Sequence, residues 1–238
     1  RRSFSASERS KELKMKNYDV VLFDLDGTLT DPGEGITNSV IYSLKKYNIQ
    51  IKDRSELYKF IGPPLHESYE KYFGFSKEEA KKAVEYYREY YKDTGIFENK
   101  LYDGIKELLC DLQNSGICLG VATSKPKVFA ERILKYFDIA QYFSFIAGAN
   151  LDGSKTRKEE VISDALDLCG VENRSLIVMV GDRKYDILGA KKFDIDSIGV
   201  LFGYGSREEL ENSGATYIAE KVRDIFSIVT RDPIIVDK

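Results

Sequence analysis

The sequence predicts an α/β protein with an open parallel β-sheet core and an all-helical segment inserted after the first strand. Two observations support this fold class. Short apolar runs alternate with helical patterns along most of the chain, while residues 34–97 contain helical patterns alone. Strands buried on both faces read as continuous apolar runs, and their alternation with helices predicts parallel strands joined by right-handed crossovers.

Six runs have the length and composition of buried strands. Each is mostly apolar on both faces and stops at polar or glycine residues. The runs are Asp19–Phe23, Ile117–Ala122, Phe143–Gly148, Leu176–Val180, Ser197–Leu201 and a weaker Tyr217–Ala219. We therefore expect these six segments to form the sheet.

Helical patterns fill the intervals between the later runs. Apolar residues at Ile105, Leu108, Leu109 and Leu112 have helical spacing and are followed by Gly116, which is typical of a helix C-terminus. A second helix is expected to open near Pro126, because proline suits the first helical turn. A third covers Val161–Leu168, and a short one follows Asp186.

The inserted segment contains four helical patterns and many tyrosines. The patterns are Ile36–Tyr47, Glu56–Ile61, Leu65–Phe73 and Lys77–Tyr91. We interpret the tyrosines as helix–helix packing with solvated hydroxyls rather than as a binding surface; they are Tyr69, Tyr72, Tyr86, Tyr87, Tyr90 and Tyr91. The expected organisation is a core of 15–32 and 98–230, an insert of 33–97, a tag or disordered leader at 1–14, and a tail at 231–238.

Composition narrows the range of partners. The formal net charge is −3, and no apolar stretch approaches the length that spans a bilayer. We therefore expect neither a nucleic-acid polymer nor a membrane as partner. Cys110, Cys118 and Cys169 lack metal-ligand spacing, which favours reduced thiols in the cytoplasm, and the single histidine argues against zinc. Any metal is expected to be a hard cation bound by oxygen.

The most informative residues follow the first strand. Asp24 and Asp26 are two apart, so in an extended chain both carboxylates face one side while Leu25 faces the core. Two carboxylates in one tight site are tolerable when a cation or a shared proton lies between them. Gly27 permits a sharp turn, and Thr28 adds a hydroxyl. The alternative is that both aspartates only cap a loop.

Other strand ends supply complementary groups. Thr123 and Ser124 precede a helix N-terminus, which suits an anion, although an ordinary N-cap would read the same way. Asp182 and Asp186 follow the fourth strand and are spaced to face one side of an early-starting helix. Lys155 and Lys158 both qualify to reach a phosphate, and either would otherwise be a surface lysine. Ligands of open α/β sheets bind at this edge, so together these groups indicate phosphoryl transfer.

These motifs, in this order, resemble the haloacid dehalogenase superfamily over about residues 15–229. The resemblance implies a Rossmann-like core with a small helical cap that closes over the site. It also implies that Asp24 attacks phosphorus, that Asp26 is the acid and base, and that Thr123 and a lysine hold the phosphoryl group. Mg²⁺ would be bound by Asp24, the Asp26 carbonyl and Asp182, with Asp186 in support. Lys158 is favoured for the lysine because residues 158–162 resemble the lysine and helix opening of that family, and Lys155 is the alternative.

The inserted segment provides the evidence for the substrate class. Residues 60–68, a proline-stiffened apolar segment, resemble the branch of phosphoglycolate phosphatases and 5′-nucleotidase-like enzymes, and we favour the nucleotidase-like side. His66 in this segment is a candidate substrate contact. A sugar phosphomutase is the closest enzyme alternative and a non-catalytic binding module the more distant one. The expected ligand is a small phosphomonoester, and monomer and homodimer both remain open.

Overall fold

The computed structural model describes residues 18–230. The expected leader at 1–14 and tail at 231–238 lie outside the described residues. The core is a six-stranded parallel sheet in the order β5-β4-β1-β6-β7-β8. Its strands are β1 (Val20–Phe23), β4 (Cys118–Pro126), β5 (Phe145–Ala149), β6 (Ile177–Gly181), β7 (Asp196–Val200) and β8 (Tyr217–Ala219). All six predicted strands are present, and the predicted fold class is confirmed.

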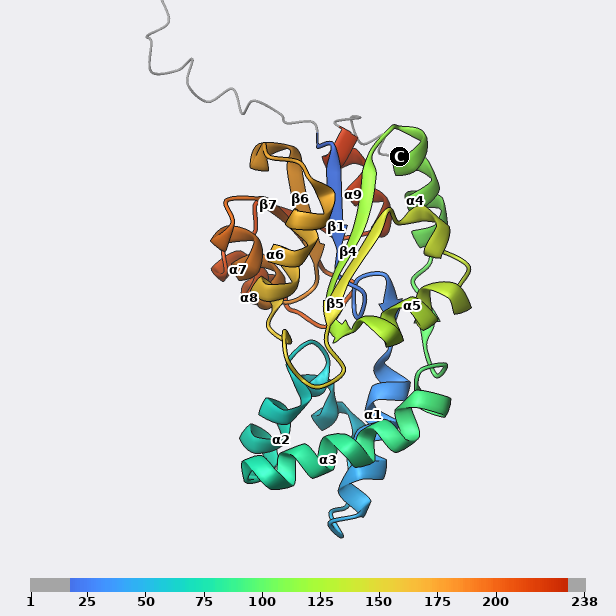
Figure 1. Ribbon diagram of the computed structural model, residues 1–238, viewed down its shortest axis with the longest axis vertical. Coiled ribbons are helices and arrows are strands. Elements are labelled where there is room, and N and C mark those ends of the chain that lie inside the picture. Colours follow the sequence, from blue (N-terminus) through green and yellow to red (C-terminus); the bar gives the residue numbers. More distant parts are fainter. Residues whose placement is uncertain (1–17, 231–238) are drawn as a thin grey trace, which may run out of the picture.

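Helices cover both faces of the sheet (Figure 1). One face carries α6 (Lys158–Cys169) and α7 (Lys184–Lys192), and the other carries α4 (Ile105–Asn114), α5 (Lys127–Tyr136) and α9 (Val222–Thr230). Short elements complete the core: α8 (Arg207–Asn212), η4 (Ala140–Tyr142) and η5 (Arg174–Leu176). Alternate residues of β1 point to opposite faces, so Val20 and Leu22 pack with α6 while Val21 and Phe23 join the larger cluster on the other side.

The inserted segment is helical, as predicted. It contains α1 (Gly33–Lys45), η2 (Arg54–Phe60), α2 (Leu65–Phe73), α3 (Lys77–Tyr90) and a π-helical turn, η3 (Tyr91–Gly95). A capping box at Ser76 and Glu79 fixes the start of α3. The chain crosses between the two parts at a small antiparallel pair, β2 (Thr30–Asp31) and β3 (Lys100–Leu101), which the sequence patterns did not predict.

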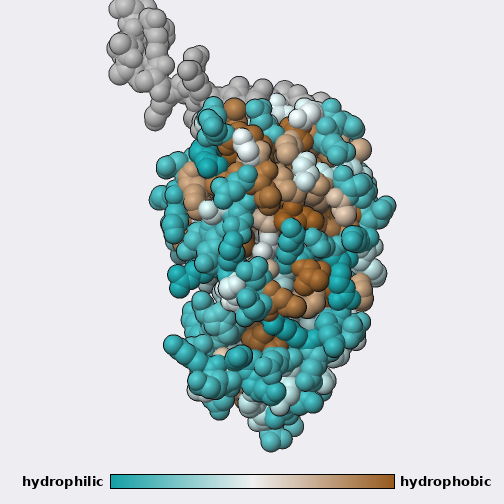
Figure 2. All heavy atoms as spheres, in the orientation of Figure 1, coloured by the Kyte–Doolittle hydropathy of each residue, from teal (hydrophilic) through white to brown (hydrophobic). Residues whose placement is uncertain are grey.

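The tyrosine cluster of the insert serves chiefly as packing. Tyr69 and Tyr87 are buried, with Tyr69 stacked on Phe75 and Tyr87 stacked on Tyr91. Figure 2 shows polar side chains over most of the insert, while apolar side chains gather on the core and along its junction with the insert. Among residues 18–230, no helix is both long enough and apolar enough to cross a bilayer.

Candidate active site

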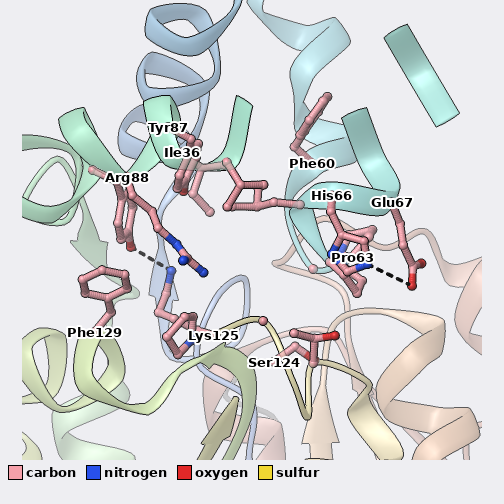
Figure 3. A pocket seen from close by; sticks show the side chains of 18 of the residues that line it. Ile36, Phe60, Pro63, His66, Glu67, Tyr87, Arg88, Ser124, Lys125 and Phe129 are labelled. Atoms are coloured by element: carbon pink, nitrogen blue, oxygen red, sulfur yellow. Dashed lines mark hydrogen bonds and ion pairs between the residues drawn. The ribbon is translucent and has the colours of Figure 1, made fainter. Parts of the chain in front are cut away.

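The carboxyl ends of the parallel strands face the helical insert, and a cavity of about 640 Å³ lies between the two parts. Its floor contains Asp24, Asp26, Thr123 and Ser124 from the core. Its opposite wall contains residues of η2, α2 and α3, among them Phe60, His66 and Arg88 (Figure 3). A cavity of this size, at this edge of an α/β sheet, is where a small ligand is expected to bind.

The floor is built on the end of β1. The Asp24 backbone N–H donates to the Val180 carbonyl at 2.9 Å, which continues the pairing with β6 for one residue. Leu25 is fully buried in the core, whereas Asp24 and Asp26 both line the cavity. The alternation expected from the sequence therefore places two carboxylates on the same side of the chain.

The structure separates the two candidate lysines. Lys158 is the first residue of α6 and is buried, with its Nζ 2.8 Å from Asp24 Oδ1 and 2.9 Å from Asp186 Oδ1. It also donates to the Ala122 carbonyl at 3.2 Å. Lys155 is exposed and pairs with Asp164 at 2.9 Å. Lys158 therefore lies in the site, and Lys155 lies away from it.

Neighbouring carboxylates favour the protonated form of Lys158. Burial alone would lower the pKa of its ammonium, but Asp186 and Asp24 outweigh that effect and raise it. A positive group beside Asp24 is suited to holding a transferring phosphoryl group.

Three buried carboxylates meet beside Lys158. Asp24, Asp182 and Asp186 each offer an oxygen, and these oxygens lie within 4.8 Å of one another. Burial, followed by repulsion from Asp186 and Asp24, raises the pKa of Asp182 well above its ordinary range. Burial also raises the pKa of Asp186 to about 6, although Lys158 opposes the shift. A cluster of hard oxygen ligands with this much repulsion fits a divalent cation such as Mg²⁺.

Two residues after Asp26 accommodate this cluster of carboxylates: Gly27 leaves space for it, and Thr28 donates a hydrogen bond to it. Gly27 has a left-handed backbone, with a φ of 82°, and a Cβ there would lie 2.2 Å from Asp182 Oδ2. Only glycine fits this position without displacing the carboxylate. Asp182 accepts hydrogen bonds from the Tyr204 backbone N–H at 2.7 Å and from Thr28 Oγ1 at 3.5 Å. Gly27 and Thr28 thus act on Asp182 rather than on the cavity.

Thr123 and Ser124 lie at the end of β4, where its register with β5 shifts before Pro126. Thr123 is buried, and its Oγ1 accepts a hydrogen bond from the Lys125 backbone N–H at 3.3 Å. The following helix, α5, begins at Lys127. The expected arrangement of a hydroxyl before a helix N-terminus is therefore present at the cavity floor.

Three further cavity residues did not emerge from the sequence. Lys125 is buried and forms an ion pair with Asp26, with Nζ 2.8 Å from Oδ2. Tyr91 accepts a hydrogen bond from the same ammonium at 2.7 Å. Arg88 projects from α3 into the cavity (Figure 3). The position of Lys125 directly after Thr123 and Ser124 was an available signal, whereas nothing in the sequence marked Tyr91 or Arg88 among the other residues of the insert.

Comparison with known proteins assigns the family. The model of the haloacid dehalogenase-like hydrolases matches residues 21–200. The chain belongs to this family. A 5′-nucleotidase of Pseudomonas aeruginosa is 46% identical over 200 residues, which cover 84% of this chain and 90% of that protein. Tyrosine-protein kinase PtkA of Mycobacterium tuberculosis is 40% identical over 200 residues, covering 84% of this chain and 67% of the kinase.

Solved structures agree with this assignment. The crystal structure of a predicted phosphatase from Clostridium acetobutylicum superimposes with a TM-score of 0.86 at 50% identity, covering 89% of this chain and 98% of that one. The family match and the phosphatase relatives together show that this protein is a phosphatase.

Proposed function

We propose that the enzyme hydrolyses a small phosphate monoester through an aspartyl-phosphate on Asp24, with Mg²⁺ as cofactor. The observation that carries this proposal is the ion pair between Asp24, on the floor of the cavity next to Asp26, and the buried Lys158. A carboxylate oxygen of Asp24 attacks phosphorus, and the bond between phosphorus and the leaving oxygen breaks. Lys158 and Thr123 hold the phosphoryl group while it transfers.

Asp26 is proposed as the general acid and base. Burial raises the pKa of its carboxyl, while Lys125 acts against that shift. A raised pKa lets a carboxyl carry a proton nearer neutral pH, which suits delivery to the leaving oxygen. Asp26 then takes a proton from water, and the water oxygen attacks phosphorus to release phosphate and restore Asp24.

The buried carboxylates form the proposed metal-binding site. We propose that Asp24, Asp182 and the Asp26 carbonyl hold Mg²⁺, with Asp186 supporting them. When bound, the cation supplies positive charge against the phosphate oxygens. The residues of the chain orient the monoester, and Lys158 balances the charge of Asp24 and Asp186.

The cavity wall favours nucleoside 5′-monophosphates over phosphoglycolate. The volume of about 640 Å³ is far larger than a glycolate needs, and the apolar side chains of Pro63 and Leu65 line the cavity beside its polar groups. Arg88 and His66 add hydrogen-bond donors to the wall. The relative named 5′-nucleotidase supports the same choice.

Three alternatives are less well supported. A sugar phosphomutase must grip a second phosphate, and the loop of Gly62, Pro63 and Pro64 brings no basic side chain to the cavity. The basic residues of the cavity wall, Lys77, Lys81 and Arg88, lie on α3 instead, so the bisphosphate-primed isomerisation of a sugar phosphate is the assay that tests this alternative. The relative named a tyrosine kinase shares phosphoryl chemistry, and transfer from ATP to a tyrosine would reveal such an activity here. A non-catalytic binding module would not explain why Asp24 and Lys158 form a buried ion pair at the cavity.

Phosphate release from a panel of monoesters, with and without Mg²⁺, tests the proposal. The panel contains nucleoside 5′-monophosphates, phosphoglycolate, sugar phosphates and phosphotyrosine, with ATP plus a tyrosine peptide as a separate arm. We expect magnesium-dependent release that is fastest from the nucleotides. Release from phosphoglycolate above the nucleotides would refute the substrate assignment, and no release from any monoester would refute the activity. We further propose a cytoplasmic location, on the scattered cysteines.

A further inference from the structure

Lys125 is a buried ammonium group that the proposed reaction does not yet use. Its Nζ lies 2.8 Å from Asp26 Oδ2 and donates to the Tyr91 hydroxyl at 2.7 Å. It also lies 4.7 Å from the centroid of the Tyr91 ring. Buried lysines are rare unless they are paired, and this one joins a residue of the core to a residue of the insert.

The ion pair defines the orientation of Asp26. Lys125 occupies Oδ2, while Oδ1 is buried and accepts no hydrogen bond from any residue between 18 and 230. Asp26 lines the cavity, and because Lys125 holds Oδ2, the unpaired Oδ1 is the oxygen left to carry a proton. Without the ammonium, the carboxyl would lose the contact that fixes its rotamer.

The other partner of Lys125 belongs to the insert. Tyr91 opens η3, directly after α3, and its ring stacks on Tyr87 with centroids 5.2 Å apart. The same ring contacts Phe129 of the core helix α5 edge to face, at 5.5 Å. The Tyr91 hydroxyl therefore reaches Lys125 only while the insert lies against the core. Figure 3 shows the two parts in this arrangement.

We propose that Lys125 is a positioning residue that aims Asp26 at the leaving oxygen and, through Tyr91, couples this orientation to contact between insert and core. This inference rests on the proposed phosphatase reaction. Closure over a substrate places the Tyr91 hydroxyl on Lys125, and Lys125 holds Oδ2 of Asp26. Acid catalysis is then available only in the closed enzyme, which limits reaction with water in the open one.

Leaving-group dependence distinguishes this role from a structural one. Protonation by Asp26 matters for an alkyl oxygen and little for p-nitrophenolate, which leaves unprotonated. For Lys125→Met we expect kcat for a nucleoside 5′-monophosphate to fall about 10²-fold, and kcat for p-nitrophenyl phosphate to fall less than about 10-fold. Tyr91→Phe retains the ring and the ion pair, and should show the same preference with a loss of roughly 3- to 10-fold. Lys125→Arg should restore part of the loss.

A double variant tests whether Lys125 acts through Asp26. Adding Lys125→Met to Asp26→Asn should cause little further loss, because the group that Lys125 positions is already gone. Lys127→Met, at an exposed position on α5, and Tyr86→Phe, at a half-buried position on α3, are matched controls that should retain wild-type kcat.

Two results would overturn the inference while leaving the phosphatase intact: an equal loss on both substrates in Tyr91→Phe and Lys125→Met, or full additivity in the double variant. Absence of phosphate release by the wild-type enzyme from either monoester would instead refute the proposed function, and this inference with it.

Discussion

The floor and the wall of the cavity differ in how their charges are arranged. At the floor, Asp24 pairs with buried Lys158, which also pairs with buried Asp186. On the wall, His66 is partly exposed and lies 4.0 Å from Glu67, while Arg88 is half-buried and makes no ion pair or hydrogen bond with residues 18–230. Fixed charges at the floor are organised in advance for one chemical step, whereas Arg88 can take its partner from the leaving group.

Removing the nucleophile should give the largest effect. Asp24→Asn retains the size of the side chain and its place beside Lys158, but it removes the attacking carboxylate. We expect kcat to fall by more than about 10⁴-fold on every monoester. Circular dichroism and thermal unfolding should match the wild type. Full activity in this variant would show that the floor is not the reacting surface.

Removing the acid and base should give a smaller effect that depends on the leaving group. Asp26→Asn is expected to lower kcat about 10²- to 10⁴-fold for a nucleoside 5′-monophosphate and much less for p-nitrophenyl phosphate. Steady-state kinetics on the two substrates measure the difference. Uniform loss across leaving groups would mean that Asp26 positions the site without transferring a proton.

A change in the wall should affect binding rather than chemistry. Burial lowers the pKa of the Arg88 guanidinium, yet this group remains charged at neutral pH and makes no hydrogen bond or ion pair with the part of the chain that the structure describes. Arg88→Met is expected to raise KM for a nucleotide roughly 10-fold, with kcat within about 3-fold of wild type. Exposed Lys92→Met, also in the insert, is the control. A fall in kcat with unchanged KM would remove the distinction between wall and floor.

The buried carboxylates predict how metal and pH affect stability. The pKa of Asp186 is raised from 3.8 to about 6, so the folded metal-free protein binds this proton more tightly than the unfolded chain. The contribution of Asp186 to stability therefore falls as pH rises through that interval. Mg²⁺ competes with the protons, so it should raise Tm more at pH 7.5 than at pH 5.

Differential scanning calorimetry measures this effect. At about a hundred times Kd the metal contributes about 2.7 kcal/mol, or roughly 5–10 °C in a chain of this size. Asp182→Asn should reduce the shift, while Asp111→Asn, at a partly exposed position on α4, should not. Equal shifts at both pH values would contradict the metal assignment.

The residues of the cavity floor could be predicted from the sequence more completely than the residues of its wall. Strand ends mark where buried runs stop, so Asp24, Thr123 and Asp182 could be placed at one sheet edge by local pattern alone. Local pattern left Lys155 and Lys158 open, and only the resemblance to the family's lysine motif favoured Lys158, which the structure places beside Asp24.

The wall could not be placed in the same way. The contact between Lys125 and Tyr91 joins residues 34 apart across two parts of the chain. Tyr91 was interpreted as packing together with its neighbours, and it does pack, but its hydroxyl also reaches the ammonium that holds Asp26. The strands β2 and β3, two residues each, are too short to leave a periodic signal.

The β2–β3 pair has a mechanical consequence. Both chain crossings between core and insert pass through it, and the Tyr102 backbone N–H adds a bond to the Leu29 carbonyl at 3.2 Å. Two adjacent antiparallel tethers joined by hydrogen bonds resist sliding and twisting more strongly than bending about their common line. The insert is therefore expected to swing along essentially one path, so that each return brings the same side chains of its wall to the same atoms of the floor.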